Sequence, residues 1–422
     1  MGKKLFPWEV SDGKVRVNNL INRREFLSIC GGLTASALLP RWTWAADLPR
    51  DVKITRIVGF DLVSKRCKVC GKNSRSDVHG DKATDRMVRV FTNTGLEGLG
   101  NCRATEASLA SLVGKNPFDF FRSEEPAFRS PLGVGTMPLW DLAGKALKKP
   151  VYELLGGRGQ QRVPVYDGSI YFQDLMPEYA DRWPDRFKEE IDLGFRRGHR
   201  AFKIKIGRGA MWMPLEEGYE RDKAVVSLIR RHVGPEIILA VDANDHGYDL
   251  ARTKRFLTEL PNIDLAFMEE MFPEEVKLYL DLKAFFAEKK LKTLIADGET
   301  QKTLDPFKPF LAARAIDIYE GDINTFGIEG IMTEAAWARP EDSRVSPHGW
   351  GSLAGFYESL QVGRAITNFY RSENDPLDSD VLIADGYVIK DGTASVPDAP
   401  GFGLKLDEKQ FAETITPKFD LK

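Results

Sequence analysis

The chain has 422 residues, of which 42% are hydrophobic and 29% are charged. This is the composition of a globular protein, and the length allows one large domain and a smaller one, each with its own core. The 60 basic and 62 acidic residues give a formal net charge of -2, which excludes the strongly positive footprint typical of nucleic-acid-binding proteins.

The first 46 residues are expected to be an export signal and not part of the globular fold. Arg23 and Arg24 stand in "NRREFL", and a weakly apolar stretch rich in Gly, Ala and Ser follows. This order is typical of twin-arginine signals, which direct folded proteins to the periplasm. The apolar stretch is too short for a membrane span of about 20 residues, so no stable span is expected after signal removal. Cleavage would follow Ala45 or Ala46 in "TWAAD"; an uncleaved anchor and a disordered tail are the alternatives.

Residues 47–160 have the pattern of a small α+β domain. Residues 52–63 and 86–99 alternate apolar and polar side chains, which predicts two strands, and "NTG" supplies a hairpin turn. The polar segment "GKNSRSDVHGDKATD" between them is predicted to be a loop. From about residue 104 the pattern becomes helical and ends at Gly156-Gly157, as helices commonly do.

The cysteines do not form an obvious framework. Cys67 and Cys70 have the spacing of a redox or metal half-site, but no second such pair completes it. With Cys102 the number of cysteines outside the expected signal is odd, so the sequence predicts either one local disulfide or free thiols.

Residues 161–385 contain a repeated alternation of short apolar runs and amphipathic stretches of helix length. The runs start about 20 to 40 residues apart, as βα units require. Eight such units favour a (β/α)8 barrel over a doubly wound sheet. The last segment, 386–422, is turn-rich and strand-like and is expected to return to the first domain. The runs are "VPVYDG", "AFKIKIG", "IILAVDAN", "LAFMEEM", "TLIADGE", "AIDIYEGD", "SRVSPHG" and "ITNFYRSE".

Charged and polar residues stand at the ends of these runs. In a barrel of parallel strands the carboxyl ends open onto one mouth, where the chemistry is found. We therefore expect one site that contains Lys203, Lys205, Asp242, Asn244, Glu269, Glu270, Asp297, Glu299, Asp322 and His348.

Three of these acids, Asp242, Glu269 and Glu299, come from successive strands. Carboxylates brought this close repel one another, and a bound divalent cation offsets this electrostatic repulsion. A set of oxygen ligands without cysteine or histidine favours Mg²⁺ over zinc. The alternative is that they are solvated acids paired with Lys or Arg.

Two lysines, Lys203 and Lys205, alternate with Ile204, so both point to the same side of their strand. In a closed barrel that side is the interior, where an ammonium group needs anionic partners. Burial and a neighbouring cation lower the pKa of a lysine, which makes a general base feasible.

His348 lies between a proline and a glycine, a setting more typical of a surface loop. However, it follows the seventh run, beside the run that ends in Asp322. A carboxylate bonded to one imidazole nitrogen fixes the tautomer and leaves the other nitrogen free to take a proton. The pattern thus favours a proton-transfer pair, with Asp322 as a mere helix cap as the alternative.

These motifs resemble the enolase superfamily, specifically its mandelate racemase subgroup of mandelate racemase/muconate lactonizing enzyme-like proteins. They occur in order over roughly residues 52 to 410. The matching segments are "LWDLAGKALKKPVYELLGG", "KIKIG", "VDAN", "MEEMFP", "ADGE", "GDINTFGIEG", "SPHGWGS" and "PDAPGFGLKLD".

The resemblance implies a (β/α)7β-type modified TIM barrel with an α+β capping domain. It also implies Mg²⁺-assisted abstraction of the proton α to a carboxylate. The implied metal ligands are Asp242, Glu269 and Glu299, although Asp297 in "IADGE" competes with Glu299.

The resemblance also implies roles for the remaining residues. Lys205 would be a base on one face of the substrate, and His348, supported by Asp322, the base or acid on the other. Lys203 would support the carboxylate end, and Glu373 in "YRSEND" would donate to the nascent enolate. Candidates for substrate contact are Asn244 and also Ser169, since Gly168 stands where mandelate racemase contacts its substrate carboxylate.

The function expected from these features is that of an acid-sugar dehydratase. A racemase or epimerase of a hydroxy acid would use the same residues, and a periplasmic sugar-acid binding protein without turnover is the third hypothesis. The partner is expected to be a small acid sugar or hydroxy acid, with no nucleic acid, and the family implies a homo-oligomer.

Overall fold

The structure is a computed structural model that describes residues 10–11, 14–15, 43–123 and 126–422. Contacts divide the chain into one unit at Met1–Arg41 and another at Trp42–Lys422. In the first, β1 (Val10–Ser11) pairs with β2 (Lys14–Val15) in antiparallel orientation. The arginine pair and the apolar stretch of the expected export signal lie outside the described residues, whereas residues 43–46 belong to the short 3₁₀ helix η2 (Thr43–Asp47).

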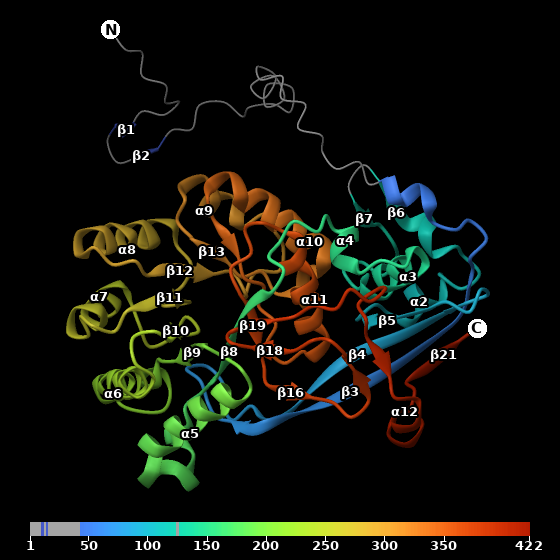
Figure 1. The fold of residues 1–422 in the computed structure, drawn as a ribbon. Coiled ribbons are helices and arrows are strands. Elements are labelled where there is room, and N and C mark those ends of the chain that lie inside the picture. The colour runs from blue at the N-terminus through green and yellow to red at the C-terminus, as the bar shows by residue number, and fades with distance from the viewer. Residues whose placement is uncertain (1–9, 12–13, 16–42, 124–125) are drawn as a thin grey trace. The chain divides into compact units, whose positions relative to one another are not determined.

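A ring of parallel strands forms the centre of the second unit (Figure 1). Neighbouring strands pair in chain order from β8 to β14, and β15 pairs with β8. The ring closes because Val345 of β14 forms a parallel bridge with Phe369, just before β15. The strands within residues 126–422 that make the ring are β8 (Val163–Ile170), β9 (Ala201–Lys205), β10 (Ile238–Asp242), β11 (Leu265–Glu269), β12 (Leu294–Asp297), β13 (Ile318–Tyr319), β14 (Arg344–Val345) and β15 (Ser372–Asn374).

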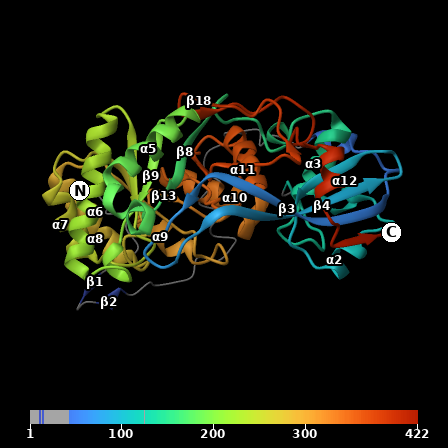
Figure 2. The same ribbon diagram turned by 90° about the horizontal axis from the view of Figure 1, so that it is seen from below.

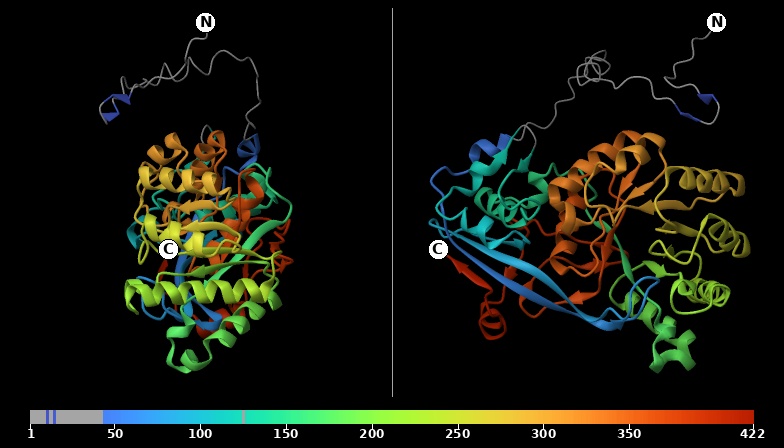
Figure 3. Two further views of the ribbon diagram at one scale, coloured as in Figure 1. Left: turned by 90° about the vertical axis from the view of Figure 1, so that its left-hand side faces the viewer. Right: turned by 180° about the vertical axis from the view of Figure 1, so that it is seen from behind.

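A helix follows each of the first seven ring strands, and Figure 3 shows these helices on the outside of the strands. After β15 the chain instead enters β16 (Leu377–Asp378), which pairs with β3 (Ile54–Cys70) of the capping domain. The predicted (β/α)7β barrel with an α+β capping domain is thus confirmed, and the doubly wound alternative is wrong. The helices in residues 126–422 between ring strands are η4 (Gln173–Leu175), η5 (Pro177–Arg182), α5 (Trp183–Arg196), η6 (Arg208–Ala210), α6 (Leu215–Val233), α7 (Leu250–Glu259), α8 (Val276–Lys289), α9 (Phe307–Ala313), α10 (Ile323–Ala338), η7 (Arg339–Glu341) and α11 (Leu353–Ala365).

The alternation of side chains along the strands produces two layers of packing. Outward residues such as Phe202, Ile204 and Val241 join the main core beneath the helices. Inward residues form a separate cluster that fills the floor of the ring: Tyr166, Ala201, Ala240, Phe267, Ala296 and Ile318. The side chains above this floor are the polar strand-end residues.

The capping domain is built on an antiparallel sheet of β3, β4 and β5, joined at its edge by β21. Figure 2 shows α2, α3 and α12 gathered around this sheet, away from α5 to α8 of the barrel. Its elements are β3 (Ile54–Cys70), β4 (Gly80–Thr92), β5 (Glu97–Asn101), α2 (Glu106–Ala110), η3 (Pro117–Phe120), β6 (Phe121–Arg122), β7 (Ala127–Phe128), α3 (Met137–Leu147), α4 (Val151–Leu154), β17 (Leu382–Ile383), β20 (Lys405–Leu406), α12 (Glu408–Thr414) and β21 (Phe419–Leu421).

The segment 386–422 contacts both parts of this unit. Its first hairpin, β18 (Ile389–Lys390) and β19 (Thr393–Ala394), pairs with β8 of the barrel. Its last strand, β21, pairs with β3 of the capping domain. The start of the segment therefore packs on the barrel, and the return to the capping domain begins at Gly401, which bridges Pro150, and at Phe402, whose N–H donates to Asp141.

The β3–β4 hairpin differs from the sequence prediction, which ended the first strand at residue 63 and began the next at residue 86. The two strands continue to Cys70 and from Gly80, and the hairpin reaches toward α5 and β9 (Figure 1). The extension looks polar because it buries Arg66 and Lys68 on one face. Their partners are Asp375 and Glu190, both 2.7 Å away and remote in sequence, so local patterning does not reveal the strand.

Cys67, Cys70 and Cys102 are free thiols. The local disulfide offered as an alternative is therefore wrong in this structure. Burial raises the pKa of Cys102 to about 11, which makes it an unreactive core residue. In the described part of the chain, no helix combines the length and apolar character needed to cross a bilayer.

Candidate functional site

The strand register brings the predicted residues of β9, β10 and β11 to the same level. Lys203 and Lys205 lie beside Ala240 and Asp242 of β10, and Asp242 lies beside Glu269 of β11. All of these charged residues are buried, with at most 5% of each residue exposed. Because their strands are parallel and in register, the charges occupy one end of the ring.

Each lysine is held by acids within the ring. Lys203 Nζ lies 2.5 Å from Glu269 Oε1, 3.1 Å from Glu373 Oε1 and 3.3 Å from Asp242 Oδ2. Lys205 Nζ donates to Asp242. The inward orientation and the anionic partners inferred from the "KIK" pattern are therefore observed.

The pKa of Lys205 differs from the expectation. Burial lowers it, but Asp242 and Glu299 outweigh both burial and Lys203, and the pKa is raised above its usual value. The pKa of Lys203 is raised well above its usual value, because Glu269 and Glu373 outweigh burial. The prediction of a lowered lysine pKa is wrong here. It was based on burial and on the neighbouring cation, whereas the acids that the ring brings close to each ammonium group have the larger effect.

The pKa values of the acids in the site depend on how close each carboxylate lies to the ammonium groups of Lys203 and Lys205. Burial and the nearby Asp242 raise the pKa of Glu269 to about 8. The pKa of Asp242 is lowered, since Lys205 and Lys203 outweigh its burial. The second carboxylate oxygen of Glu269, Oε2, is buried and has no hydrogen-bond partner among the described residues.

This arrangement bears on whether a divalent cation fits. Among the described residues, no three His, Cys, Asp or Glu side chains converge into a ready metal cage; instead the ammonium groups of Lys203 and Lys205 lie between the acids. The donors are nevertheless suited to a hard cation, because Asp242, Glu269 and Glu299 offer only oxygen and Glu269 Oε2 lacks a partner. The residues present therefore fit Mg²⁺ in donor chemistry.

The two candidate acids after β12 point in different directions. Asp297 accepts from the hydroxyl of Tyr279 on α8 and from the backbone N–H of Gly298 at 2.7 Å. Glu299 instead lies 3.1 Å from His348 Nε2, and its other oxygen accepts from Arg75 at 2.7 Å. The carboxylate that faces the site is therefore Glu299, and Asp297 is bound on the side of the helix layer.

His348 and Asp322 form a hydrogen-bonded pair, with His348 Nδ1 2.7 Å from Asp322 Oδ2. The other oxygen of Asp322 caps α10 by accepting from Thr325 N at 2.8 Å. Asp322 thus serves both as the helix cap and as the partner of the imidazole, which the sequence treated as alternatives. Burial lowers the pKa of His348, but Glu299, Glu373 and Asp322 together raise it to about 10.

Glu373 lies between the first ring strand, β8, and the loop that carries His348. Glu373 Oε2 accepts from Gly349 N at 3.1 Å and lies 3.7 Å from His348 Nε2. A Cβ at Gly168 would lie only 2.5 Å from Glu373 Oε1, so the glycine leaves room for this carboxylate. The hydroxyl of Ser169 is turned to the buried Asp167, and the structure does not bring it to the acids and lysines of the site.

The family model for enolase C-terminal domain-like proteins matches residues 186–410, more than half of the chain. The chain belongs to the enolase superfamily. Arabinonate dehydratase of Saccharolobus solfataricus is 31% identical over 286 residues, which cover 67% of this chain and 70% of that enzyme.

Solved structures support the same assignment for this enolase-superfamily chain. Galacturonate dehydratase from Geobacillus sp., in complex with D-galacturonate and 5-keto-4-deoxy-D-galacturonate, has 31% identity and a TM-score of 0.81, covering 89% of this chain and 100% of that one. A mutant of that dehydratase is complexed with Mg, at 30% identity and a TM-score of 0.81, over 89% of this chain and 99% of that one.

Backbone strain marks the loops that follow β10 and β11. Asn244, Asp245 and Glu270 adopt φ of 45°, 61° and 44°, in the left-handed region that costs energy for non-glycine residues. Asn244 Nδ2 donates to Glu270 Oε2 at 3.0 Å, while Asn244 Oδ1 and Glu270 Oε1 are buried without partners among the described residues. The predicted contact residue Asn244 is therefore held at the edge of the site by Glu270.

Two site residues of this superfamily member were missed from the sequence. Arg75 reaches Glu299 from the β3–β4 hairpin, and no local signal in its polar segment indicates that contact. Glu320 is buried beside Glu269, and burial together with the charge of Glu269 raises the pKa of the Glu320 carboxyl well above its usual value. Its position two residues after the inward Ile318 would have revealed it, because side chains repeat every second residue.

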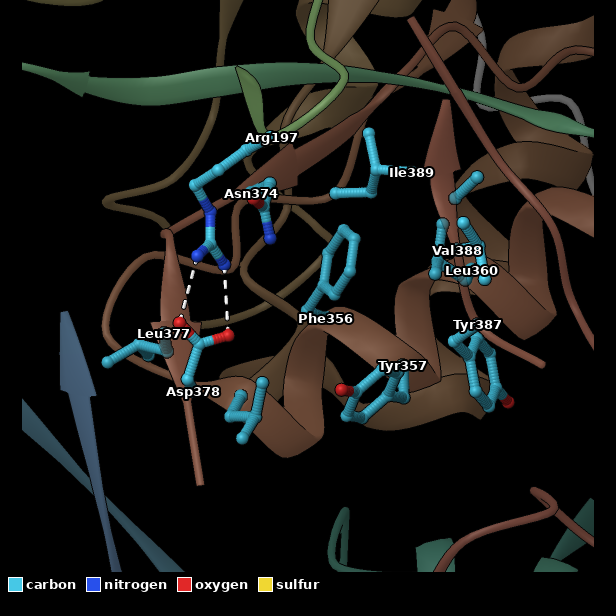
Figure 4. A pocket seen from close by; sticks show the side chains of 12 residues that line it. Arg197, Phe356, Tyr357, Leu360, Asn374, Leu377, Asp378, Tyr387, Val388 and Ile389 are labelled. Atoms are coloured by element: carbon cyan, nitrogen blue, oxygen red, sulfur yellow. Dashed lines mark hydrogen bonds and ion pairs between the residues drawn. The ribbon is translucent and has the colours of Figure 1, made fainter. Parts of the chain in front are cut away.

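The cavity drawn in Figure 4, of about 310 Å³, is separate from this site. It lies outside the ring between α11 and the end of α5, where an eighth helix would pack in a complete barrel. Phe356, Tyr357 and Tyr387 line it, and Arg197 is paired with Asp378 at its edge.

Proposed function

We propose that this protein is an acid-sugar dehydratase that removes the proton α to a carboxylate and eliminates the β-hydroxyl. The observation that carries the proposal is the placement of two proton carriers at one end of the ring. Lys205 comes from β9 and His348 follows β14, so they approach the acidic cluster from different strands. The arabinonate and galacturonate dehydratases similar to this chain support the same class of substrate.

In this mechanism the neutral amine of Lys205 takes the α proton and becomes an ammonium group, while the electron pair of the C–H bond moves into an enolate. The C–O bond to the β-hydroxyl then breaks, and the N–H of His348 supplies the proton with which that hydroxyl leaves as water. The enol that remains becomes a 2-keto-3-deoxy acid. Asp322 keeps the imidazole oriented throughout, because its carboxylate is fixed by the cap of α10.

Magnesium is part of the proposal. Asp242, Glu269 and Glu299 would hold it, and when bound it would stabilise the negative charge that develops on the substrate carboxylate. Lys203 would position that end of the substrate by donating to its carboxylate, and Glu373, 3.1 Å from Lys203 Nζ, would hold the ammonium group in place.

The test is a screen of mono- and diacid sugars with Mg²⁺ in deuterated water. A dehydratase yields a 2-keto-3-deoxy product, and the variants Lys205→Met and His348→Asn abolish it. Cys67→Ser is the matched control, because this exposed thiol lies away from the site. The absence of proton exchange with every acid in the screen would refute the proposal and favour a binding protein without turnover.

A racemase or epimerase is the second candidate, because a base on each side of the substrate would allow Lys205 and His348 to exchange protons. The same experiment separates the two reactions. Deuterium incorporation with inversion and no loss of water indicates epimerisation.

We also propose export to the periplasm by the twin-arginine signal in residues 1–46, followed by assembly into a homo-oligomer. Cleavage after Ala45 or Ala46 would remove Trp44, whose ring lies 4.7 Å from that of Phe121. Cell fractionation of an Arg23→Lys, Arg24→Lys variant tests export, and the mass of the exported protein locates the cleavage site. Light scattering after size exclusion tests assembly, and a monomer would contradict it.

A further inference from the structure

Three aromatic rings from separate segments meet beside the proton carriers. His79, the residue before β4, lies 4.7 Å from Tyr171, and Tyr171 lies 5.0 Å from Trp350. His79 and Trp350 are 6.4 Å apart and perpendicular. We call His79, Tyr171 and Trp350 the ring cluster.

The ring cluster adjoins the reacting groups on both sides. The ammonium of Lys205 lies 5.4 Å from the centroid of Tyr171. Trp350 follows His348 by two residues, in the same loop after β14. The cluster therefore contacts Lys205 through Tyr171 and shares a loop with His348 through Trp350, while His79 comes from the capping domain.

One buried polar atom of the ring cluster makes no hydrogen bond to any residue that the structure describes. His79 Nε2 is buried and has no hydrogen-bond partner among the described residues. The backbone N–H of His79 donates to Cys70 O at 3.0 Å, and its imidazole packs edge-on against the ring of Tyr171 at 4.7 Å. A buried polar atom without a partner is costly, and this one is suited to a hydrogen bond with a ligand.

The positive charges that border the ring cluster are each paired with an acid: Arg66 with Asp375, Arg75 with Glu299, and Lys205 with Asp242. Burial, together with Lys205, Arg66 and Arg75, lowers the pKa of His79 to about 4, so its imidazole is neutral near pH 7. Arg66 stacks on Trp350 at 4.8 Å, but Asp375 neutralises it at 2.7 Å.

We propose that His79 and Trp350 bind the end of the sugar remote from the reacting carbon and select a neutral, hydroxylated end over a second carboxylate. His79 Nε2 bonds a hydroxyl, and the part of the half-buried Trp350 indole that Arg66 and Tyr171 leave uncovered contacts the C–H groups of the sugar chain. A second carboxylate would be desolvated there without a free counterion. This inference rests on the proposed dehydratase function and narrows its substrates to acid sugars with one carboxylate.

The first test compares a six-carbon aldonate that is turned over with the aldarate of the same configuration. We expect the aldonate to have a kcat/KM at least roughly tenfold higher, as expected for one desolvated charge or lost hydrogen bond. An aldarate used equally well or better would overturn the inference while leaving the dehydratase function intact. No turnover of any acid sugar would instead refute the proposed function.

The second test uses variants of His79. His79→Leu should raise KM for the aldonate by roughly tenfold with a smaller change in kcat, while His79→Gln, whose amide can still bond a hydroxyl, recovers most of the loss. Glycerate, which lacks the remote carbons, should bind with equal affinity to wild type and His79→Leu in calorimetric titrations. His232→Leu is the control, because His232 pairs with Asp192 on the outer helices. Equal KM values for wild type and His79→Leu would overturn the inference.

Discussion

The dual role of Asp322 leads to a prediction that separates catalysis from stability. Replacing Asp322 by Asn should leave the fold intact, because Asn caps helices as well as Asp and its amide oxygen can still accept from Thr325 N. With the oxygen engaged by the cap, the NH₂ group of the Asn faces His348 Nδ1, now 2.7 Å from Asp322 Oδ2. An N–H donor at that position forces Nδ1 to accept and places the imidazole proton on Nε2.

The expected loss follows from this change of tautomer. The imidazole can then neither take a proton at Nε2 nor be stabilised as a cation by a carboxylate. General acid–base catalysis contributes about 10² to 10⁴ in rate, so kcat should fall by that range, or about 3 to 5 kcal/mol in the activation barrier.

The assay is the rate of product formation together with deuterium exchange at the α carbon, and thermal unfolding is measured in parallel. Asp322→Ala is the comparison, because it removes the cap as well and should lower stability by about 1 kcal/mol. If Asp322→Asn retained wild-type kcat, the assignment of His348 and Asp322 as a proton-transfer pair would be wrong. If it unfolded at a much lower temperature, the assumption that the cap is preserved would be wrong.

Three further predictions concern buried charge and metal. Lys68→Met should lower the free energy of unfolding by about 2 to 4 kcal/mol in urea titrations, because it leaves Glu190 buried with Arg186 as its remaining partner. The control is Lys65→Met at an exposed position of the same strand, which should lower the free energy of unfolding by less than about 0.5 kcal/mol. Equal effects of the two substitutions would show that the buried ion pair is not what stabilises the fold here. Burial raises the pKa of Glu334 to about 8, so the folded state keeps a proton that the unfolded chain releases. The free energy of unfolding should therefore fall as pH rises from about 4.5 to 8. Glu334→Gln should flatten this dependence on pH, and an unchanged dependence would contradict the raised pKa of Glu334. Removal of divalent cations with a chelator should abolish α-proton exchange and Mg²⁺ should restore it, whereas exchange that persists in the chelator would argue against a metal site.

The barrel and much of its site could be predicted because they follow from the period of the strands. The apolar runs set the eight strands, and residues at their carboxyl ends must share one mouth. Lys203, Lys205, Asp242 and Glu269 needed no further information, since register and alternation determine where they point.

The rest depends on contacts between remote segments. Arg66 and Lys68 look like loop residues until Asp375 and Glu190 pair with them, and those pairs extend the hairpin over the barrel.

The order of residues along the chain is enough to identify which side chains stand at the strand ends and therefore which chemistry the ring can hold. How those charges balance depends on folding, which raises the pKa of Lys205, turns Ser169 to Asp167 and brings His79 beside Trp350. The physical reason is that alternation is a local property of the backbone, whereas burial and electrostatic partners depend on segments that meet only when the chain is folded.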